Sequence, residues 1–124
     1  MRKTLFLCLL LAVTAGVKAQ SLKGTSWKLY LDDLRDTLTF HIGTDSCYTT
    51  DGSGEVVVRS LCRISKDTIT LKDIDGKYVC PGEEGVYTYL FLADGLTLTM
   101  VKDPCDNRSG AINGAKWVRA KDGK

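Results

Sequence analysis

The stretch VYTYLFLADGLTLTMV, residues 86–101, decides the fold class of this chain. Two runs of alternating side chains flank the turn Ala93-Asp94-Gly95, whose glycine tolerates the backbone angles of a tight turn. Because successive side chains of a strand point to opposite sides, Leu96, Leu98 and Met100 share one face. The stretch therefore predicts a β-hairpin with an apolar inner face.

The same pattern recurs through the rest of the chain. Runs of β-branched, aromatic and aliphatic residues are broken by turn residues about every eight to twelve positions, and no window keeps a helical period for more than about two turns. A helical turn is expected only at 109–112, and an irregular loop is expected around Cys80. The chain thus predicts an all-β domain with eight strands, at residues 27–31, 37–42, 47–50, 55–64, 68–71, 86–92, 96–101 and 115–120.

Antiparallel strands with one apolar face remove their exposed edges most simply by closing on themselves. We therefore expect an eight-stranded antiparallel up-and-down barrel. A β-sandwich has the same alternation and turn spacing and is the alternative. The chain ends distinguish the two, because in a barrel Trp27 on the first strand meets Arg119 on the last, where the guanidinium can stack on the indole.

The first 19 residues are typical of a secretory signal peptide. Arg2 and Lys3 form a positive start, residues 5–13 form an apolar run broken only by Cys8, and Val17-Lys18-Ala19 places small residues where signal peptidase cleaves. The apolar run is about half of the roughly twenty residues that a membrane-spanning helix needs. We expect a signal at residues 1–19, a domain at residues 20–120, a disordered tail at 121–124, and a secreted or periplasmic protein without a membrane span.

The charge of the expected mature domain argues against nucleic acid as a partner. The chain has 17 Lys and Arg and 15 Asp and Glu, and three of the basic residues, Arg2, Lys3 and Lys18, fall within the signal. This leaves 14 basic side chains against 15 acidic ones, with both signs interspersed. We therefore expect the mature domain to lack the basic patch that binding to nucleic acid or to an anionic membrane surface requires.

Removal of the signal leaves four cysteines in a small chain bound for an oxidising compartment, which predicts two disulfides. Four cysteines allow three pairings, and their order along an up-and-down chain favours Cys47 with Cys62 and Cys80 with Cys105. The spacings contain no Cys-x-x-Cys segment, and the single histidine, His41, belongs to none of them. We therefore expect no zinc site.

No catalytic constellation stands out, so we do not expect an enzyme. Glu83 and Glu84 are neighbours on an extended chain and point to opposite sides, so they cannot flank one bond as a general acid and base. Asp73-x-Asp75-Gly76 resembles the start of a calcium loop, but Gly82 stands where its glutamate is required. His41 alternates with apolar residues, so it should face away from the core and do no chemistry. Neither a metal nor a cofactor is expected.

The ligand-binding candidates are the side chains expected inside the barrel. Aromatic rings line apolar pockets, and a tyrosine hydroxyl can orient a ligand. Strands of about five or six residues predict a small pocket, entered through the mouth of the barrel. We expect a small, largely apolar ligand to contact Phe40, Tyr87, Tyr89, Leu98 and Met100, with Leu38 and Leu96 also inside.

Two sets of motifs resemble a known family. Gly24 and Trp27 near the start of the domain, together with Arg119 near its end, resemble the calycin superfamily. In that superfamily one residue separates the glycine from the tryptophan, whereas two residues separate them here. The segments CPGEEGVYTYLF, LTLTMVKDPCDNR and WVR resemble bacterial secreted lipocalin-like domains with a Cys-Pro-Gly segment and an Asp-Pro-Cys-x-x-Arg motif. This resemblance implies a non-catalytic binding barrel, a Cys80–Cys105 bridge, and Arg108 as the arginine of the motif.

Two further resemblances give alternatives. GTSWKL and DGLTLT resemble strands of small periplasmic protease inhibitors, which implies an interaction protein that meets its partner through residues 20–23 or the loop 80–85. GTSWKL also resembles the opening of META-type envelope domains, but Asp45-Ser46-Cys47 stands where those domains usually carry Gly-Cys-Asn. The partner is thus a small apolar molecule or a protein, and the sequence leaves the oligomeric state open.

Overall fold

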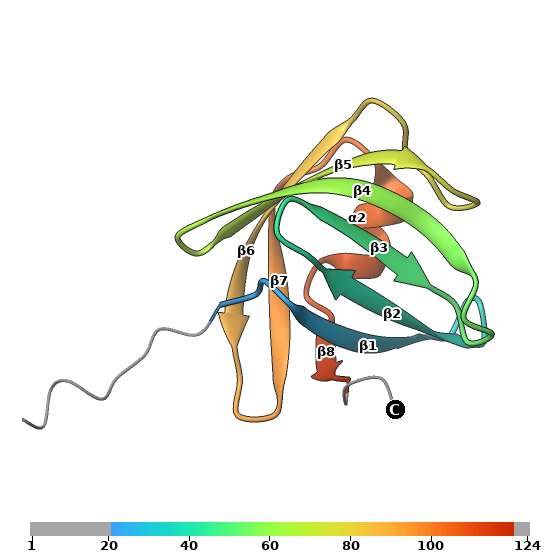
Figure 1. Cartoon of the computed structure of the whole chain (residues 1–124), viewed down its shortest axis with the longest axis horizontal. Helices are drawn as coiled ribbons and strands as arrows, with labels where there is room; N and C mark the ends of the chain where they lie inside the picture. The colour runs from blue at the N-terminus through green and yellow to red at the C-terminus, as the bar shows by residue number, and fades with distance from the viewer. Residues whose placement is uncertain (1–20, 121–124) are drawn as a thin grey trace, which may run out of the picture.

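The structure, a computed structural model, describes residues 21–120, which form a closed eight-stranded antiparallel β-barrel (Figure 1). Each strand pairs with the next along the chain, and the last returns to pair with the first. The predicted up-and-down barrel is confirmed. The elements are β1 (Thr25–Leu31), β2 (Asp36–Ile42), β3 (Ser46–Thr50), β4 (Val56–Ser65), β5 (Thr68–Asp75), β6 (Glu84–Phe91), β7 (Gly95–Lys102), α2 (Asp106–Ile112) and β8 (Lys116–Arg119).

The predicted signal, residues 1–19, and the predicted tail, residues 121–124, lie outside the described residues. No helix within residues 21–120 has the length and apolar character that a membrane crossing requires.

The short strand β8 closes the barrel. It pairs with β1 at Trp27 and Lys28 and with β7 at residues 95–97, and the Ala120 N–H donates to the Ser26 carbonyl at 2.9 Å. Gly95 makes this possible, because a Cβ at that position would lie 2.5 Å from the Trp117 carbonyl oxygen. The glycine of the predicted hairpin turn thus also lets two strands approach each other closely.

The alternation read from the sequence produces the core. Inward-facing side chains from all eight strands pack in the barrel interior, which at this strand number is just wide enough to be filled by side chains. The buried cluster consists of Leu22, Trp27, Phe40, Ile42, Cys47, Cys62, Ile69, Leu71, Tyr87, Leu96, Leu98 and Trp117.

Leu22 belongs to this core although it precedes β1. Its side chain is fully buried, and its carbonyl accepts the Thr25 N–H at 3.2 Å. Of the stretch 20–23, which the interaction alternative treats as the contact with a partner, the described residues 21–23 are therefore anchored in the fold at Leu22.

Two elements extend three or more residues beyond the ends that the sequence pattern predicts. β5 continues to Asp75 rather than ending at Leu71, because Asp73 is buried in the strand and accepts a hydrogen bond from Ser60 at 2.8 Å. α2 begins at Asp106 rather than Ser109, because the Cys105 side chain caps it by accepting the Arg108 N–H at 3.4 Å. Both extensions depend on partners that are distant in sequence or on an unusual cap.

The four cysteines behave as two different pairs. Cys80 and Cys105 form a disulfide with a Cα–Cα distance of 6.3 Å, which joins the loop before β6 to the start of α2. The predicted bridge between Cys47 and Cys62 is not formed in the structure, where both are buried free thiols. Cys47 lies opposite Ser60 on β4, so Cys62 is its diagonal neighbour. Such neighbours are typically about 7–8 Å apart, beyond the usual reach of a disulfide.

Candidate functional site

The barrel interior is occupied by aromatic packing. Ring centroids lie 5.8 Å apart for Phe40 and Trp117, 6.1 Å for Trp27 and Phe91, and 5.7 Å for Tyr89 and Phe91. These spacings are those of contacting aromatic side chains. The middle of the barrel is therefore a packed core rather than a ligand cavity.

The five side chains predicted to bind a ligand do not form one pocket. Phe40, Tyr87 and Leu98 are buried in the core, and Tyr89 packs against it, whereas Met100 is 39% exposed. None of the five lines either of the two hollows described below. The expected placement of Met100 inside is corrected, because the end of β7 from residue 99 to residue 102 is exposed throughout.

The two interior tyrosines also use their hydroxyl groups within the protein. The Tyr87 hydroxyl donates to Asp103 Oδ2, and the Tyr89 hydroxyl donates to the Lys66 carbonyl. Burial, and then the hydrogen bond to Asp103, raise the pKa of Tyr87 well above its ordinary value. Neither hydroxyl is free to orient a bound molecule.

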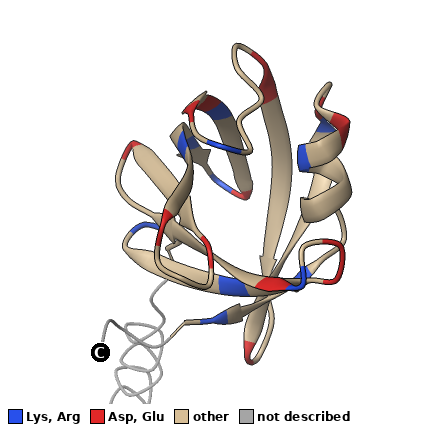
Figure 2. Ribbon diagram, turned by 90° about the vertical axis from the view of Figure 1, so that its right-hand side faces the viewer, with Lys and Arg blue, Asp and Glu red and all other residues tan. Residues whose placement is uncertain are grey.

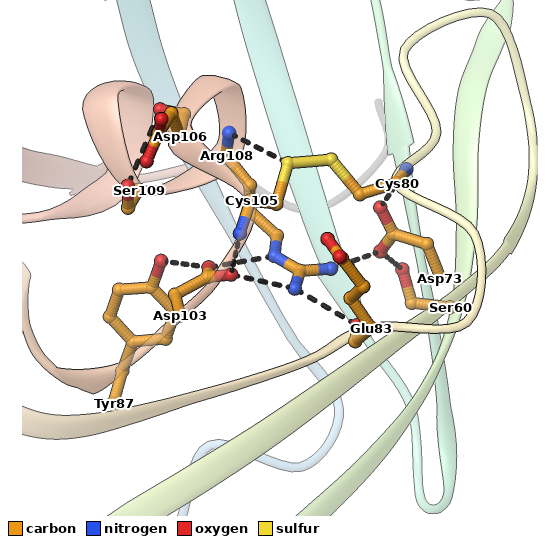
Figure 3. A network of polar contacts seen from close by, with 10 residues as sticks. All are labelled: Ser60, Asp73, Cys80, Glu83, Tyr87, Asp103, Cys105, Asp106, Arg108 and Ser109. Carbon is orange, nitrogen blue, oxygen red and sulfur yellow. Dashed lines mark hydrogen bonds and ion pairs between the residues drawn. A yellow bond between two sulfur atoms is a disulfide. The ribbon is translucent and has the colours of Figure 1, made fainter.

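One end of the barrel holds a buried network around Arg108 (Figure 3). The Arg108 guanidinium donates from Nε and Nη2 to the two carboxylate oxygens of Asp103, both at 2.8 Å, and from Nη2 to the Glu83 carbonyl at 3.0 Å. Its Nη1 lies 3.3 Å from Asp73 Oδ1. This bidentate geometry is the strong form of an arginine–carboxylate pair.

The disulfide and a glycine complete this network. Asp73 accepts the Cys80 N–H at 2.9 Å, so the loop that carries the disulfide is tied to β5. Gly85 leaves room for the ion pair, because a Cβ there would lie 2.6 Å from Asp103 Oδ2 and 3.1 Å from Arg108 Nε. We call the residues Asp73, Asp103 and Arg108, with Tyr87 and Ser60, the Arg108 network.

The network favours the charged form of Asp103. Burial alone would raise the pKa of Asp103, but hydrogen bonds from Arg108 and Tyr87 outweigh it, and the pKa lies below its ordinary value. Burial would lower the pKa of Arg108, but the hydrogen bond to Asp103 raises it. Because the three charged side chains are buried and paired with one another, the arrangement is suited to holding the fold.

The sequence indicated part of this network. The Asp-Pro-Cys-x-x-Arg spacing identified Arg108 and brought Asp103 close to it along the chain. Asp73, considered only for its resemblance to the start of a calcium loop, and Ser60 were missed. They belong to β5 and β4, and no local signal shows that these strands bring them to the same end of the barrel as the motif.

Trp27 and Arg119 meet where the barrel closes. They are opposite each other in the β1–β8 ladder, and the guanidinium carbon lies 5.2 Å from the centre of the indole. Together with Phe91 and the β6–β7 turn they border a hollow of about 140 Å³. This volume is small for a ligand site, and the pair serves to close the barrel.

The larger hollow lies on the flank of the barrel over β3, β4 and β5. It measures about 370 Å³, and we call it the flank hollow. The Tyr48 ring, which is 44% exposed, borders it beside the guanidinium of Arg59, its partner across the ladder. A register shift between Arg59 and Ser60 interrupts the β4–β5 pairing there. The lining residues are Ser46, Cys47, Tyr48, Val56, Arg59, Ser60 and Ile74.

His41 supports the edge of this region. Its ring stacks on Tyr48 with centroids 4.4 Å apart, and its two nitrogens are bonded to Ser26 Oγ and Thr50 Oγ1, each at 3.0 Å. Burial lowers its pKa, so the ring is neutral at neutral pH. The sequence placed His41 away from the core but did not predict that it joins β1, β2 and β3.

Charge is distributed over the turns and strand ends, and both signs are interspersed in the view of Figure 2. Within the described part of the chain, no three His, Cys, Asp or Glu side chains are grouped so that they could hold a metal ion.

The closed strand topology and the buried cluster thus define a small lipocalin-like β-barrel with a packed interior. Comparisons with protein-family models, with curated proteins and with solved structures found no match to this chain. Its membership of a particular lipocalin-like family remains a prediction from the motifs.

Proposed function

We propose that this protein is an exported, non-catalytic binding protein that takes a small, largely apolar molecule in the flank hollow. The observation that carries the proposal is a hollow of about 370 Å³ bordered by an exposed aromatic ring. Ligand sites commonly have volumes of about 300–1,000 Å³ and combine apolar walls with a few polar groups. The Cys80–Cys105 disulfide supports export, because such bonds persist in oxidising compartments.

The lining suggests what kind of molecule fits. Tyr48 offers a flat ring, while Val56 and Ile74 supply aliphatic contact. Arg59 is the one charged group, and its guanidinium is held at 3.1 Å from Asp75 at the surface. A planar apolar molecule with one acidic group would satisfy the ring, the aliphatic side chains and the guanidinium together.

The proposal is tested with 8-anilinonaphthalene-1-sulfonate, a planar apolar dye with one anionic group, by fluorescence titration of the folded protein. We expect saturable binding at one site. Ile74→Ser and Tyr48→Ala should each weaken it by about tenfold, the loss of one good apolar contact. Leu90→Ser is the matched control, because Leu90 is also exposed but lies on β6 outside the hollow.

Native mass spectrometry of protein collected from the export compartment gives a second readout. A retained molecule that is lost in Tyr48→Ala supports the proposal. If the dye binds wild type and Ile74→Ser equally while Leu90→Ser weakens it, the flank hollow is not the site.

The alternative function is that of an interaction protein, and the loop 80–85 favours it over the N-terminal stretch. This loop is fixed by the disulfide at Cys80 and by Arg108 at the Glu83 carbonyl, while Glu83 and Glu84 remain exposed. A rigid exposed loop is a suitable element for a protein contact. Inhibition of a secreted protease by the wild type but not by a Glu83→Lys/Glu84→Lys variant would favour this reading.

A further inference from the structure

A single row of residues crosses the barrel wall through the flank hollow. Its members stand opposite one another in successive ladders from β1 to β5: Ser26, His41, Tyr48, Arg59 and Asp75. Side chains that stand directly opposite each other in a ladder are close enough to interact. The row therefore connects the hollow with β1 and β2, two strands that do not line it.

His41 and the hollow lie on opposite sides of the Tyr48 ring. The His41 ring covers one face of Tyr48, with 4.4 Å between the ring centroids and 12° between the ring planes. The other lining residues include Val56 and Arg59 on β4 and Ile74 on β5, but not His41. Because β3 lies between β2 and β4, the face of Tyr48 turned away from His41 is the one that borders the hollow.

The His41 ring is itself held from both of its nitrogens. Nδ1 is bonded to Ser26 Oγ and Nε2 to Thr50 Oγ1, each at 3.0 Å. Because hydrogen bonds weaken steeply when their geometry is distorted, two of them on one ring fix its plane. Tyr48, by contrast, is 44% exposed. The plane of the exposed ring is therefore set by the anchored ring behind it.

We propose, building on the function proposed above, that His41 is the specificity-determining residue of the flank hollow. It is a positioning residue: it holds the Tyr48 ring in one plane and so makes the hollow select planar aromatic acids over flexible aliphatic acids. His41 acts from outside the hollow, through Tyr48, and does not touch the ligand.

A ring that is fixed in advance favours a flat ligand more than a flexible one. Binding costs free energy when it must immobilise a side chain, and a ring already held in place avoids that cost. Two aromatic rings attract each other best in a few defined geometries, whereas the hydrophobic effect on a saturated chain is non-directional. Loss of the His41 ring should therefore weaken the binding of an aromatic acid more than that of an aliphatic acid of similar size.

The test compares two carboxylic acids by NMR titration of the complete mature protein: 2-naphthoate, which is planar, and decanoate, which is flexible and of similar size. We expect wild type to bind 2-naphthoate more tightly. His41→Ala should lower the ratio of the two affinities by about three- to tenfold, the loss of one well-oriented aromatic contact. His41→Phe keeps a ring against Tyr48 and should leave the ratio within about twofold of wild type. If His41→Ala does not fold, His41→Gln, which also lacks the ring, takes its place with the same expectation.

The motion of the Tyr48 ring in the free protein gives a readout that needs no ligand. Carbon relaxation of labelled tyrosine rings, assigned with Tyr48→Phe, should show greater motion of this ring in His41→Ala than in wild type or His41→Phe. Unchanged ring motion in His41→Ala would overturn the positioning role.

The outcomes separate this inference from the function on which it rests. If wild type binds neither acid in the flank hollow, the proposed function fails and the role of His41 in specificity fails with it. If wild type binds both acids but the affinity ratio is unchanged in His41→Ala, or falls equally in His41→Phe, the hollow remains a binding site and only the role of His41 is refuted.

Discussion

The Arg108 network and the flank hollow each contain an arginine, but the two arginines lie in opposite environments. Arg108 is buried and meets two carboxylates, whereas Arg59 pairs with Asp75 at the surface, where both side chains are more than half exposed. A buried charge requires its partners, because it has no water to replace them, while an exposed pair contributes little. We therefore expect the Arg108 network to stabilise the fold and the flank hollow to be available for a ligand.

The largest expected effect comes from removing the buried guanidinium. Arg108→Ala should lower the free energy of unfolding by about 3–5 kcal/mol, because Asp73 and Asp103 lose their positive partner in the interior. Arg59→Ala, the matched control, should change it by about 0–1 kcal/mol. Urea denaturation with the disulfide intact measures both, and comparable losses in the two variants would contradict the distinction between the regions.

A smaller effect is expected from crowding the network. Gly85→Ala places a methyl group 2.6 Å from Asp103 Oδ2, so the carboxylate or the strand must move, at about 1–3 kcal/mol. Gly110→Ala is the control, because no atom lies within 4 Å of its Cβ position in α2 and alanine favours a helix by about 0.5–1 kcal/mol. Thermal melts should therefore shift in opposite directions, and a stable Gly85→Ala protein would show that the network is loosely packed.

The smallest expected effect is a change of stability with acid. The pKa of Asp103 is lowered in the folded state, so as the pH falls the unfolded chain takes up the proton first. The contribution of Asp103 is complete above its ordinary pKa of about 3.9 and is lost as the pH falls through the lower folded value.

This pH dependence is measured by urea midpoints between neutral and acidic pH. Asp103→Asn should have a shallower acid slope than wild type. The acid slope of Asp51→Asn is the comparison. The pKa of Asp51 is also lowered, by a hydrogen bond from Ser53, but Asp51 lies at an exposed turn outside the Arg108 network. An unchanged slope in Asp103→Asn would mean that Asp103 does not contribute to the acid sensitivity.

The strand pattern was predictable because alternation is a local property. The hairpin at residues 86–101 keeps its predicted form as β6 and β7, and each expected strand corresponds to one of the eight in the barrel. Trp27 and Arg119 were recognised as opposite ends of the chain that closure brings together. The exceptions have causes that are not local: β5 ends in polar residues because Asp73 has buried partners that are distant in the sequence.

The candidate site was much less predictable. Tyr87 and Leu98 are suitable types to line a pocket, but the interior is filled, and the hollow lies on the outer side of strands whose sequence gives no sign of it. Tyr48, which borders the hollow, was not among the residues expected to contact a ligand. An inward ring contacts another ring rather than a ligand when the side chains of all eight strands together fill the barrel interior, and this depends on the whole set of inward residues.

The sequence by itself determined the all-β class, the expected export signal and the positions of the strands, because each of these follows from composition or short-range spacing. Only the tertiary structure decided that the interior is packed, that Arg108 meets Asp73 as well as Asp103, and that Cys47 and Cys62 are buried free thiols. These outcomes depend on the register between strands and on closure of the barrel, which are properties of the whole chain.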